Sequence, residues 1–554
     1  MITLEKWASS VSTRRGFGFP LSSLNDWGLA LIYTCLGAFL FVLAYPPWNL
    51  GVLTGWMAFI PLLACVAHTT YVRAGMLGWL FGLIANLGVF HWLLAVPGFH
   101  WYHFFLLDAY LALYPAVWAL LACRFAHGSW MAHLALAGAW VVLDYLRGHA
   151  GFLALPWITL AQSQIANLPL LQSAQIFGEP VVTFFVILGN LVLWNALAKK
   201  EFRTAWICAW PIITAMALGA ISLISNEMEE HQTIIVGALK TEYPANQVAM
   251  TDPTVRFENL MRFLTKETPR EVRLIALPES TLINPRRFPA QIDRLQKLAE
   301  GRNLTLITGI AENIKFDRSP VDELFPSSAL RSGAWIFTPD RQIPEHYEKS
   351  RLVPFAEEMP LRQWITWPTW LIPPLPEVAR AQSPLTFAIP GNIRVGIMIC
   401  WESLFSDHAR TLIQDEAAIL VMLANEGWFT DPASAQHILT AYMRTVETHR
   451  PVMVSSNMGA PLVIDPFGRR LNTTASVPGM EWATAPIPLL RESTFYVRHG
   501  DVFVFGCGLF LVSIGFFQSL RNLTTRCSFL TRRKKINPHT SKRDLPCGKR
   551  SSAW

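Results

Sequence analysis

The chain has 554 residues, of which 52% are hydrophobic and only 15% are charged, and its mean hydropathy is +0.30. Ordinary soluble domains are about one quarter charged, so this composition excludes a disordered chain and disfavours a wholly soluble globule. The formal charge of +7 belongs to one end, because residues 521–554 carry ten Lys and Arg and one acidic residue. We therefore expect no nucleic-acid partner.

Seven apolar stretches in the first 226 residues, and an eighth near the other end, are long enough to cross a bilayer, which takes about 20 mostly apolar residues. They do not resemble a cleavable signal peptide, because the first begins late and further stretches follow it. The sequence thus predicts a multi-pass α-helical membrane bundle with about eight spans. The stretches are 27–45, 52–68, 74–95, 104–123, 129–146, 170–198, 205–225 and 502–520.

Basic residues alternate between the two sides of this predicted bundle. They precede the first stretch and follow every second one, at Arg14, Arg15, Arg73, Arg124, Lys199, Lys200 and Arg203. Because Lys and Arg in short loops stay in the cytoplasm, both chain ends are predicted to be cytoplasmic. We expect five parts in chain order: a cytoplasmic N-terminal segment (1–24), a bundle of seven spans (25–226), an outer domain (227–500), an eighth span (501–520) and a basic cytoplasmic tail (521–554).

The outer region has the composition of a soluble α/β domain. Amphipathic periodicity predicts helices such as Ala290–Arg302 and Gln436–His449, and the strands between helices are apolar throughout, which favours layered sheets covered by helices. The Pro- and Trp-rich stretch from Pro354 to Pro390 has little periodicity and predicts a functional loop or lid. Expected strands are Thr233–Leu239, Arg273–Leu277, Leu304–Thr308, Gly333–Phe337, Arg394–Ile399, Ala417–Leu423, Val452–Ser456 and Leu462–Ile464.

Three reactive side chains follow predicted strands or open the next loop: Glu279, Lys349 and Cys400. Ligands gather at the carboxyl ends of strands in α/β sheets, so the three can meet. Each of the three, taken singly, has an ordinary structural interpretation: an exposed acid for Glu279, a solvated lysine for Lys349 and a core cysteine for Cys400. Together they permit thiol catalysis, in which Glu279 takes the proton of Cys400 and Lys349 faces an oxyanion together with the backbone N–H after the cysteine.

Cys400 is the only cysteine of the outer domain, so it has no disulfide partner there. The Cys and His residues also lack the spacing of a metal site, and we expect no metal and no other cofactor.

The order Glu279, Lys349, Cys400, with spacings of 70 and 51 residues, resembles the nitrilase (carbon–nitrogen hydrolase) superfamily. Wider motifs resemble the bacterial apolipoprotein N-acyltransferase family over about residues 25–520. The resemblance implies a nitrilase-like αββα sandwich for the outer domain. These motifs are Pro278-Glu279-Ser280, Lys349-x-x-Leu352-Val353-Pro354-Phe355-x-Glu357, Cys400-x-Glu402, Asn425-x-x-Trp428-Phe429, Gln436-His437, Leu155-Pro156-Trp157 and Tyr496-Val497-Arg498.

The resemblance implies a two-step, ping-pong acyl transfer at the periplasmic face of the bacterial inner membrane. Cys400 would take an acyl chain from a phospholipid, typically phosphatidylethanolamine, as a thioester. The α-amino group of the N-terminal diacylglyceryl-cysteine of an apolipoprotein would then receive it, in the last step of lipoprotein maturation. The resemblance also implies supporting roles for Glu357, Glu402, Trp401, Asn425 and Trp428.

Other functions remain open. The same three residues would serve a membrane-tethered amidase or nitrilase that hydrolyses a soluble amide, with water as the acceptor. Trp401 stands where this family usually has Tyr, and Asn425-Glu426-Gly427-Trp428 stands where Asn-Asp-Ala-Trp is more usual. A divergent paralogue acylating another amine is therefore a further alternative, whereas the complete Glu–Lys–Cys set argues against a non-catalytic scaffold.

Overall fold

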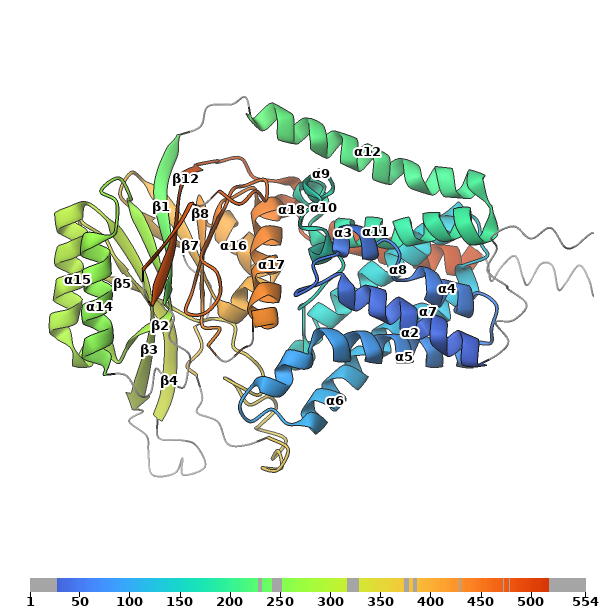
Figure 1. Cartoon of the computed structure of the whole chain (residues 1–554), viewed down its shortest axis with the longest axis horizontal. Coiled ribbons are helices and arrows are strands. Elements are labelled where there is room, and N and C mark those ends of the chain that lie inside the picture. Colours follow the sequence, from blue (N-terminus) through green and yellow to red (C-terminus); the bar gives the residue numbers. More distant parts are fainter. Residues whose placement is uncertain are drawn as a thin grey trace, which may run out of the picture.

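The computed structural model describes residues 27–227, 232–241, 252–315, 328–372, 378–381, 386–427, 429, 431–471, 473–477 and 479–517. The predicted N-terminal segment 1–24, the basic tail 521–554 and Trp428 lie outside the described residues. Figure 1 shows a helical bundle on one side and an α/β domain on the other, with helix α12 running along the bundle toward the α/β domain.

The bundle is built from apolar helices rich in Leu, Ala and Phe. A helix pairs its own backbone N–H and C=O groups, so it needs no water to satisfy them. Turns or short irregular segments separate most of them. A further apolar helix, Val502–Phe517, follows the α/β domain. The bundle helices are α2 (Trp27–Leu43), α3 (Gly51–Thr54), α4 (Ile60–Val66), α5 (Tyr71–Val89), α6 (Trp101–Leu111), α7 (Leu113–Phe125), α8 (Trp130–Gly148), α9 (Leu168–Leu171), α10 (Ala174–Phe177), α11 (Glu179–Trp194) and α12 (Phe202–Glu227).

The predicted number of spans is corrected by the structure. Within the described ranges four helices, not eight, are long and apolar enough to cross a membrane, and Trp27–Leu43 and Val502–Phe517 are apolar but shorter. The four are Tyr71–Val89, Trp101–Phe125, Glu179–Lys199 and Phe202–Ser225.

Interruptions and polar residues explain the difference. The predicted second span is broken into the short helices α3 and α4. The fifth, α8, contains His133, Asp144 and Arg147, which lower its hydropathy. Composition alone therefore does not distinguish a spanning helix from a broken or buried one.

Of the four long apolar helices in the described ranges, α12 has the smallest buried share. Only 22% of its most apolar window is buried inside the protein. Trp206, Trp210, Leu218 and Ile221 all lie on its exposed surface. A continuous apolar face of this size is typical of contact with lipid, so the helices favour membrane association.

The α/β domain contains all eight predicted strands. Four strands were not predicted: β5, β6, β11 and β12. The strands are β1 (Thr233–Thr241), β2 (Leu274–Ile283), β3 (Thr305–Lys315), β4 (Ser328–Phe337), β5 (Glu345–Glu348), β6 (Thr386–Ile389), β7 (Ile393–Ile399), β8 (Ile419–Ala424), β9 (Val452–Ser456), β10 (Leu462–Ile464), β11 (Thr473–Val477) and β12 (Met480–Pro488). The helices are α14 (Pro253–Lys266), α15 (Pro289–Arg302), α16 (Ser406–Gln414), α17 (Asp431–Thr448) and α18 (Phe495–His499).

The strands follow the order β5-β4-β3-β2-β1-β9-β8-β7-β6, and β1 meets β9 through a single residue pair, Lys240 with Ser456. The two halves fold over each other, because Val236 and Ile307 of one share a core with Ile397 and Val421 of the other. Helices α14 and α15 cover the first half, and α16 and α17 cover the second. The domain is therefore the predicted αββα sandwich (Figure 1).

Helix α17 lies between the second half-sheet and the bundle (Figure 1). The Trp92 indole of the bundle donates to Gln436 Oε1 over 3.0 Å, and Arg444 contacts Glu179 of α11 over 2.6 Å. The loop beyond Pro354 also reaches the bundle, where the Tyr102 hydroxyl donates to the Trp370 carbonyl over 2.7 Å. The carboxyl ends of β7 and β8 are thereby held close to the bundle.

Candidate active site

Glu279 lies in an irregular part of β2, where the register with β3 shifts between Leu277 and Leu282. The strands approach closely there, since a Cβ at Gly309 would lie 2.4 Å from the Glu279 Cα. The carboxylate accepts a hydrogen bond from the Ser332 hydroxyl over 3.1 Å and another from the Asn425 backbone N–H.

The Glu279 side chain is only 7% exposed. Burial raises its pKa, although the Lys349 ammonium and the hydrogen bonds oppose the rise. A carboxylate with a raised pKa is a better proton acceptor than an exposed one.

Lys349 directly follows β5 and is 1% exposed. Its Nζ lies 2.7 Å from Glu357 Oε1 and 3.6 Å from Glu279 Oε1. Burial works against the ammonium, but the carboxylates of Glu357 and Glu279 outweigh burial and raise the pKa of Lys349. The side chain therefore stays protonated at neutral pH and is a fixed positive charge.

Cys400 is the first residue after β7 and begins a 3₁₀ turn, Cys400–Leu404. Its φ of +47° lies in the left-handed region, which is uncommon for a residue other than glycine and directs the side chain out of the strand line. Burial, and then the Glu279 carboxylate, raise the pKa of the thiol, while Lys349 lowers it. The structure thus brings the three predicted residues into one electrostatic group, in which the thiol stays protonated until a base takes its proton.

Glu402 joins the loop after β5 to the turn after β7. It is fully buried and accepts hydrogen bonds from the Tyr347 hydroxyl at 2.8 Å, the Ser350 N–H at 2.7 Å and the Ile399 N–H at 2.8 Å. One carboxylate therefore sets the position of Lys349 relative to Cys400.

The other predicted supporting residues have different surroundings. Glu357 accepts from the Val353 N–H over 2.9 Å with the oxygen that does not contact Lys349. Asn425 follows β8, and its side-chain oxygen accepts from Asn457 over 2.6 Å. Trp401 is mostly buried and packs against Phe405, whereas Trp428 lies outside the described residues.

Replacing Glu402 with Gln tests its structural role. We expect a loss of about 3 kcal/mol of stability, because an amide nitrogen would face N–H and O–H donors in a buried site. Glu348→Gln, which alters the partly exposed ion pair with Arg331, is the control and should change stability by less than about 1 kcal/mol. Thermal unfolding of both variants in detergent measures the difference, and equal melting temperatures would contradict it.

Several contacting residues were not predicted as members of the site. Tyr347 and Ser350 hold Glu402, and Glu426 forms a buried pair with His437 beside the Cys400 turn. The position of Glu426, two residues beyond β8, is the same strand-end signal that pointed to Cys400 and could have identified it.

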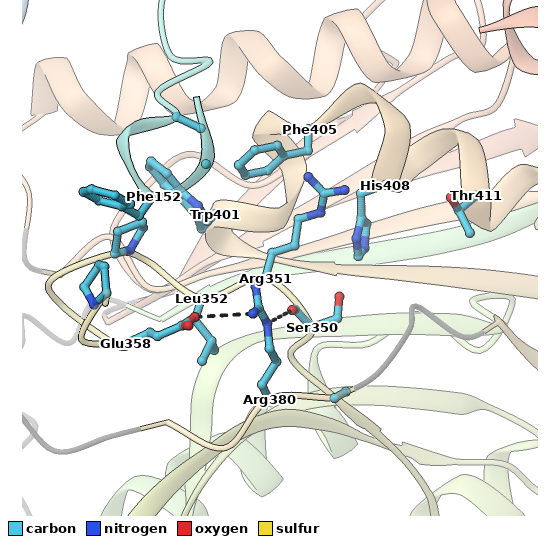
Figure 2. A pocket seen from close by; sticks show the side chains of 15 residues that line it. Phe152, Ser350, Arg351, Leu352, Glu358, Arg380, Trp401, Phe405, His408 and Thr411 are labelled. Atoms are coloured by element: carbon cyan, nitrogen blue, oxygen red, sulfur yellow. Dashed lines mark hydrogen bonds and ion pairs between the residues drawn. The ribbon is translucent and has the colours of Figure 1, made fainter. Parts of the chain in front are cut away.

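A cavity of about 780 Å³ lies beside this group, between the bundle loop at Gly151–Ala154, the loop after Lys349 and the turn after β7. The catalytic candidates do not line it, but their neighbours Ser350 and Trp401 do. Figure 2 shows Arg380 between Glu358 and Ser350, with its guanidinium 3.6 Å from the Glu358 carboxylate. Arg351, which is also drawn there, contacts Asp407 and lies 4.3 Å above the Phe405 ring.

The αββα sandwich, with a cysteine turned out of a strand end beside a Glu–Lys pair, defines a carbon–nitrogen hydrolase type of domain. The chain matches the carbon–nitrogen hydrolase family model over residues 244–484 and the apolipoprotein N-acyltransferase N-terminal domain model over residues 37–192. Together the two matches extend over most of the chain, which is therefore similar to the apolipoprotein N-acyltransferases in both of its parts.

Relatives with this name align over most of the chain. The apolipoprotein N-acyltransferase of Geobacter metallireducens is 26% identical over 503 residues, which cover 85% of this chain and 92% of the relative. That of Nitrosomonas europaea is 28% identical over 436 residues, covering 74% and 80%.

Among solved structures, a Saccharomyces cerevisiae member of the nitrilase superfamily is 18% identical with a TM-score of 0.35, covering 46% of this chain and 90% of its own. An amidase from Nesterenkonia is 14% identical with a TM-score of 0.35, covering 50% and 97%.

Proposed function

We propose that this protein moves an acyl chain from a phospholipid to the α-amino group of the N-terminal diacylglyceryl-cysteine of apolipoproteins, through a thioester on Cys400. The observation that carries the proposal is the Lys349 ammonium held between the Glu279 and Glu357 carboxylates, in the electrostatic range of the Cys400 thiol. This arrangement supplies a base, a fixed cation and a nucleophile without a cofactor.

The first half-reaction makes the thioester. Glu279 takes the proton of the Cys400 thiol while the sulfur attacks the ester carbonyl of the phospholipid, and a tetrahedral oxyanion forms. Lys349 and the N–H of Trp401 stabilise that oxyanion. The C–O bond then breaks, and Glu279 returns its proton to the departing alkoxide, so that a lysophospholipid leaves.

The second half-reaction uses the same residues in reverse. The acceptor amine attacks the thioester carbonyl and passes a proton to Glu279. When the C–S bond breaks, the thiolate of Cys400 recovers that proton. An amide is formed, and the enzyme returns to its starting state.

The bundle suits two membrane-anchored substrates. A catalytic domain held at the bilayer confines both substrates to the same surface and raises their effective concentration. On this proposal residues 25–226 and 501–520 form the membrane part of a bacterial inner-membrane protein. Residues 227–500 form its periplasmic catalytic domain and 521–554 its cytoplasmic tail, in keeping with the alternation of basic residues.

The charges of the cavity support phosphatidylethanolamine as the donor. Arg380 and Glu358 lie side by side there, and Arg351 pairs with Asp407 near them. A zwitterionic headgroup carries a phosphodiester and an ammonium, which match such adjacent opposite charges. An anionic headgroup without an amine would meet the acidic partners unfavourably.

Substitution of the Arg380–Glu358 pair tests the headgroup assignment. We expect Glu358→Gln to lower the ratio of the rates with phosphatidylethanolamine and phosphatidylglycerol about threefold, as for a partly exposed charge contact. Arg380→Gln should slow both donors, since both carry the phosphodiester. Arg362→Gln, on the same loop but outside the cavity lining, is the control. An unchanged donor ratio in Glu358→Gln would contradict the assignment.

Intact-lipoprotein mass spectrometry tests the whole function. Cells depleted of this protein and complemented with the wild type should carry lipoproteins with three acyl chains, and cells complemented with Cys400→Ser should carry two. An amidase, or a paralogue that acylates another amine, would leave the chain count of lipoproteins unchanged in both. If the protein is an amidase, the purified protein should also form no acyl adduct with phospholipid.

A further inference from the structure

A fully buried histidine of α17 contacts the backbone of the nucleophile. The Nε2 atom of His437 lies 3.2 Å from the Cys400 carbonyl oxygen and 3.1 Å from the Ser403 hydroxyl. Its Nδ1 atom lies 2.9 Å from Glu426 Oε1. The reaction steps proposed above do not use either His437 or Glu426.

Each oxygen of the Glu426 carboxylate has its own hydrogen-bond partner. The Gly459 N–H donates to the Ser456 hydroxyl oxygen over 3.0 Å, and the Ser456 O–H is directed at Glu426 Oε2 over 2.8 Å. The remaining oxygen, Oε1, lies 2.9 Å from His437 Nδ1, so these two atoms share a hydrogen bond.

The other face of the imidazole also meets oxygen atoms. The Thr440 hydroxyl donates to the His437 carbonyl over 2.8 Å, and the Ser403 hydroxyl donates to the Cys400 carbonyl over 2.8 Å. When these two hydroxyls donate to the carbonyls, the Nε2 atom faces acceptor oxygens, and the Nε2–H form of the ring donates to the Cys400 carbonyl. His437 thus joins the Glu426 carboxylate, through Nδ1, to the Cys400 carbonyl, through Nε2.

The environment keeps the imidazole in this position. The Trp157 ring, from the bundle, stacks on the His437 ring with centroids 5.2 Å apart and an interplanar angle of 20°. Behind Glu426, the absence of a side chain at Gly459 makes room for the carboxylate, because a Cβ there would lie 1.8 Å from Oε2. The bundle and the β9–β10 connection thus fix the pair from opposite sides.

The Cys400 carbonyl and the Trp401 N–H belong to the same peptide group. An N–H donor on the carbonyl oxygen polarises this group and makes its N–H a stronger hydrogen-bond donor. We propose that His437, oriented by Glu426, is a positioning residue that strengthens the Trp401 N–H toward the oxyanion in both half-reactions. This inference rests on the proposed thioester mechanism, though not on the identity of either lipid substrate.

A pair of variants isolates the Nε2–H donor. In Glu426→Gln the amide retains the shape of the site and removes the carboxylate. Adding His437→Phe to that variant keeps a ring against Trp157 and leaves no buried charge unpaired, but it removes the donor. We expect acyl-enzyme formation and aminolysis to fall about 10- to 100-fold between the two variants, somewhat less than for loss of a direct oxyanion donor.

The readout must separate this effect from a disturbed nucleophile. Alkylation of Cys400 by iodoacetamide passes through no tetrahedral oxyanion, so its rate should agree within about twofold in both variants. His346→Gln, an exposed histidine of β5, is the substitution control. A parallel loss of alkylation and acyl transfer would show a merely structural role and overturn the proposal, as would an unchanged acyl transfer rate.

The choice of acyl donor separates this proposal from the proposed function. A p-nitrophenyl acyl ester forms the thioester whatever the natural lipid is, and its release of p-nitrophenol measures the first half-reaction. If the wild type accepts this ester but not phospholipid, the proposed function fails while His437 remains testable. If the ester also reacts equally in both variants, the role of His437 is refuted.

Discussion

Cys400→Ala is expected to lower acyl transfer by at least about 10⁴-fold, because the Cys400 sulfur is the atom that carries the acyl chain in the proposed mechanism. Incubation of the purified wild type with phospholipid should add the mass of one acyl chain to the protein, and the variant should show no such adduct. Intact-protein mass spectrometry together with release of lysophospholipid measures both effects.

Another cysteine provides the matched control for this experiment. Cys507 is buried in the helix that follows the α/β domain and packs against Gly138 of α8. Cys507→Ala should keep both the adduct and the rate. Transfer that persists in Cys400→Ala would refute the thioester mechanism, and an adduct on another residue would identify a different nucleophile.

Glu279→Gln is expected to slow thioester formation by about 10³-fold, the contribution typical of a positioned general base. The amide can still accept hydrogen bonds from Ser332 and the Asn425 N–H, so the fold should be retained. Because burial raises the pKa of Glu279, wild-type activity should fall with decreasing pH from a point above the ordinary glutamate range. Activity requires the ionised form, so this acidic limb should be absent from the residual activity of Glu279→Gln.

Glu312→Gln is the corresponding control, since Glu312 is a buried carboxylate of neighbouring β3 that pairs with Arg286 and Arg331. Rates of single-turnover acylation, measured from about pH 4, near the ordinary pKa of glutamate, to about pH 9, compare the two variants. An unchanged acidic limb in Glu279→Gln would assign the titration to another group and contradict the role of Glu279 as the base.

Buried ions tie the catalytic turn to the bundle. Arg444 of α17 contacts Glu179, the first residue of α11, over 2.6 Å and donates to the Leu404 carbonyl over 3.2 Å. Glu447 completes this group and accepts from the Glu179 N–H over 2.6 Å. Separating the members of such a group would leave buried charges unpaired, which is unfavourable. These contacts therefore hold the turn after Cys400 against the bundle, and we expect the two to move together.

Several parts of the fold could be predicted because their signals are local. Apolar runs of five to seven residues predicted β7, β8 and β9 close to their observed bounds. The helical spacing of Leu439, Met443 and Val446 predicted α17. Strands β5 and β6 have only four residues each, too few for a periodic pattern, and were not predicted.

The sequence by itself determined which segments are apolar, where eight of the twelve described strands lie, and that a glutamate, a lysine and a cysteine occur in that order near strand ends. Only the tertiary structure decided that Ser332 holds Glu279, that Glu402 joins two loops and that His437 reaches the Cys400 carbonyl. It also decided how many helices are long enough to cross a membrane. The physical reason is that periodicity and propensity act over a few neighbouring residues, whereas these contacts join residues that meet only after the two half-sheets pack together and α17 lies against the bundle.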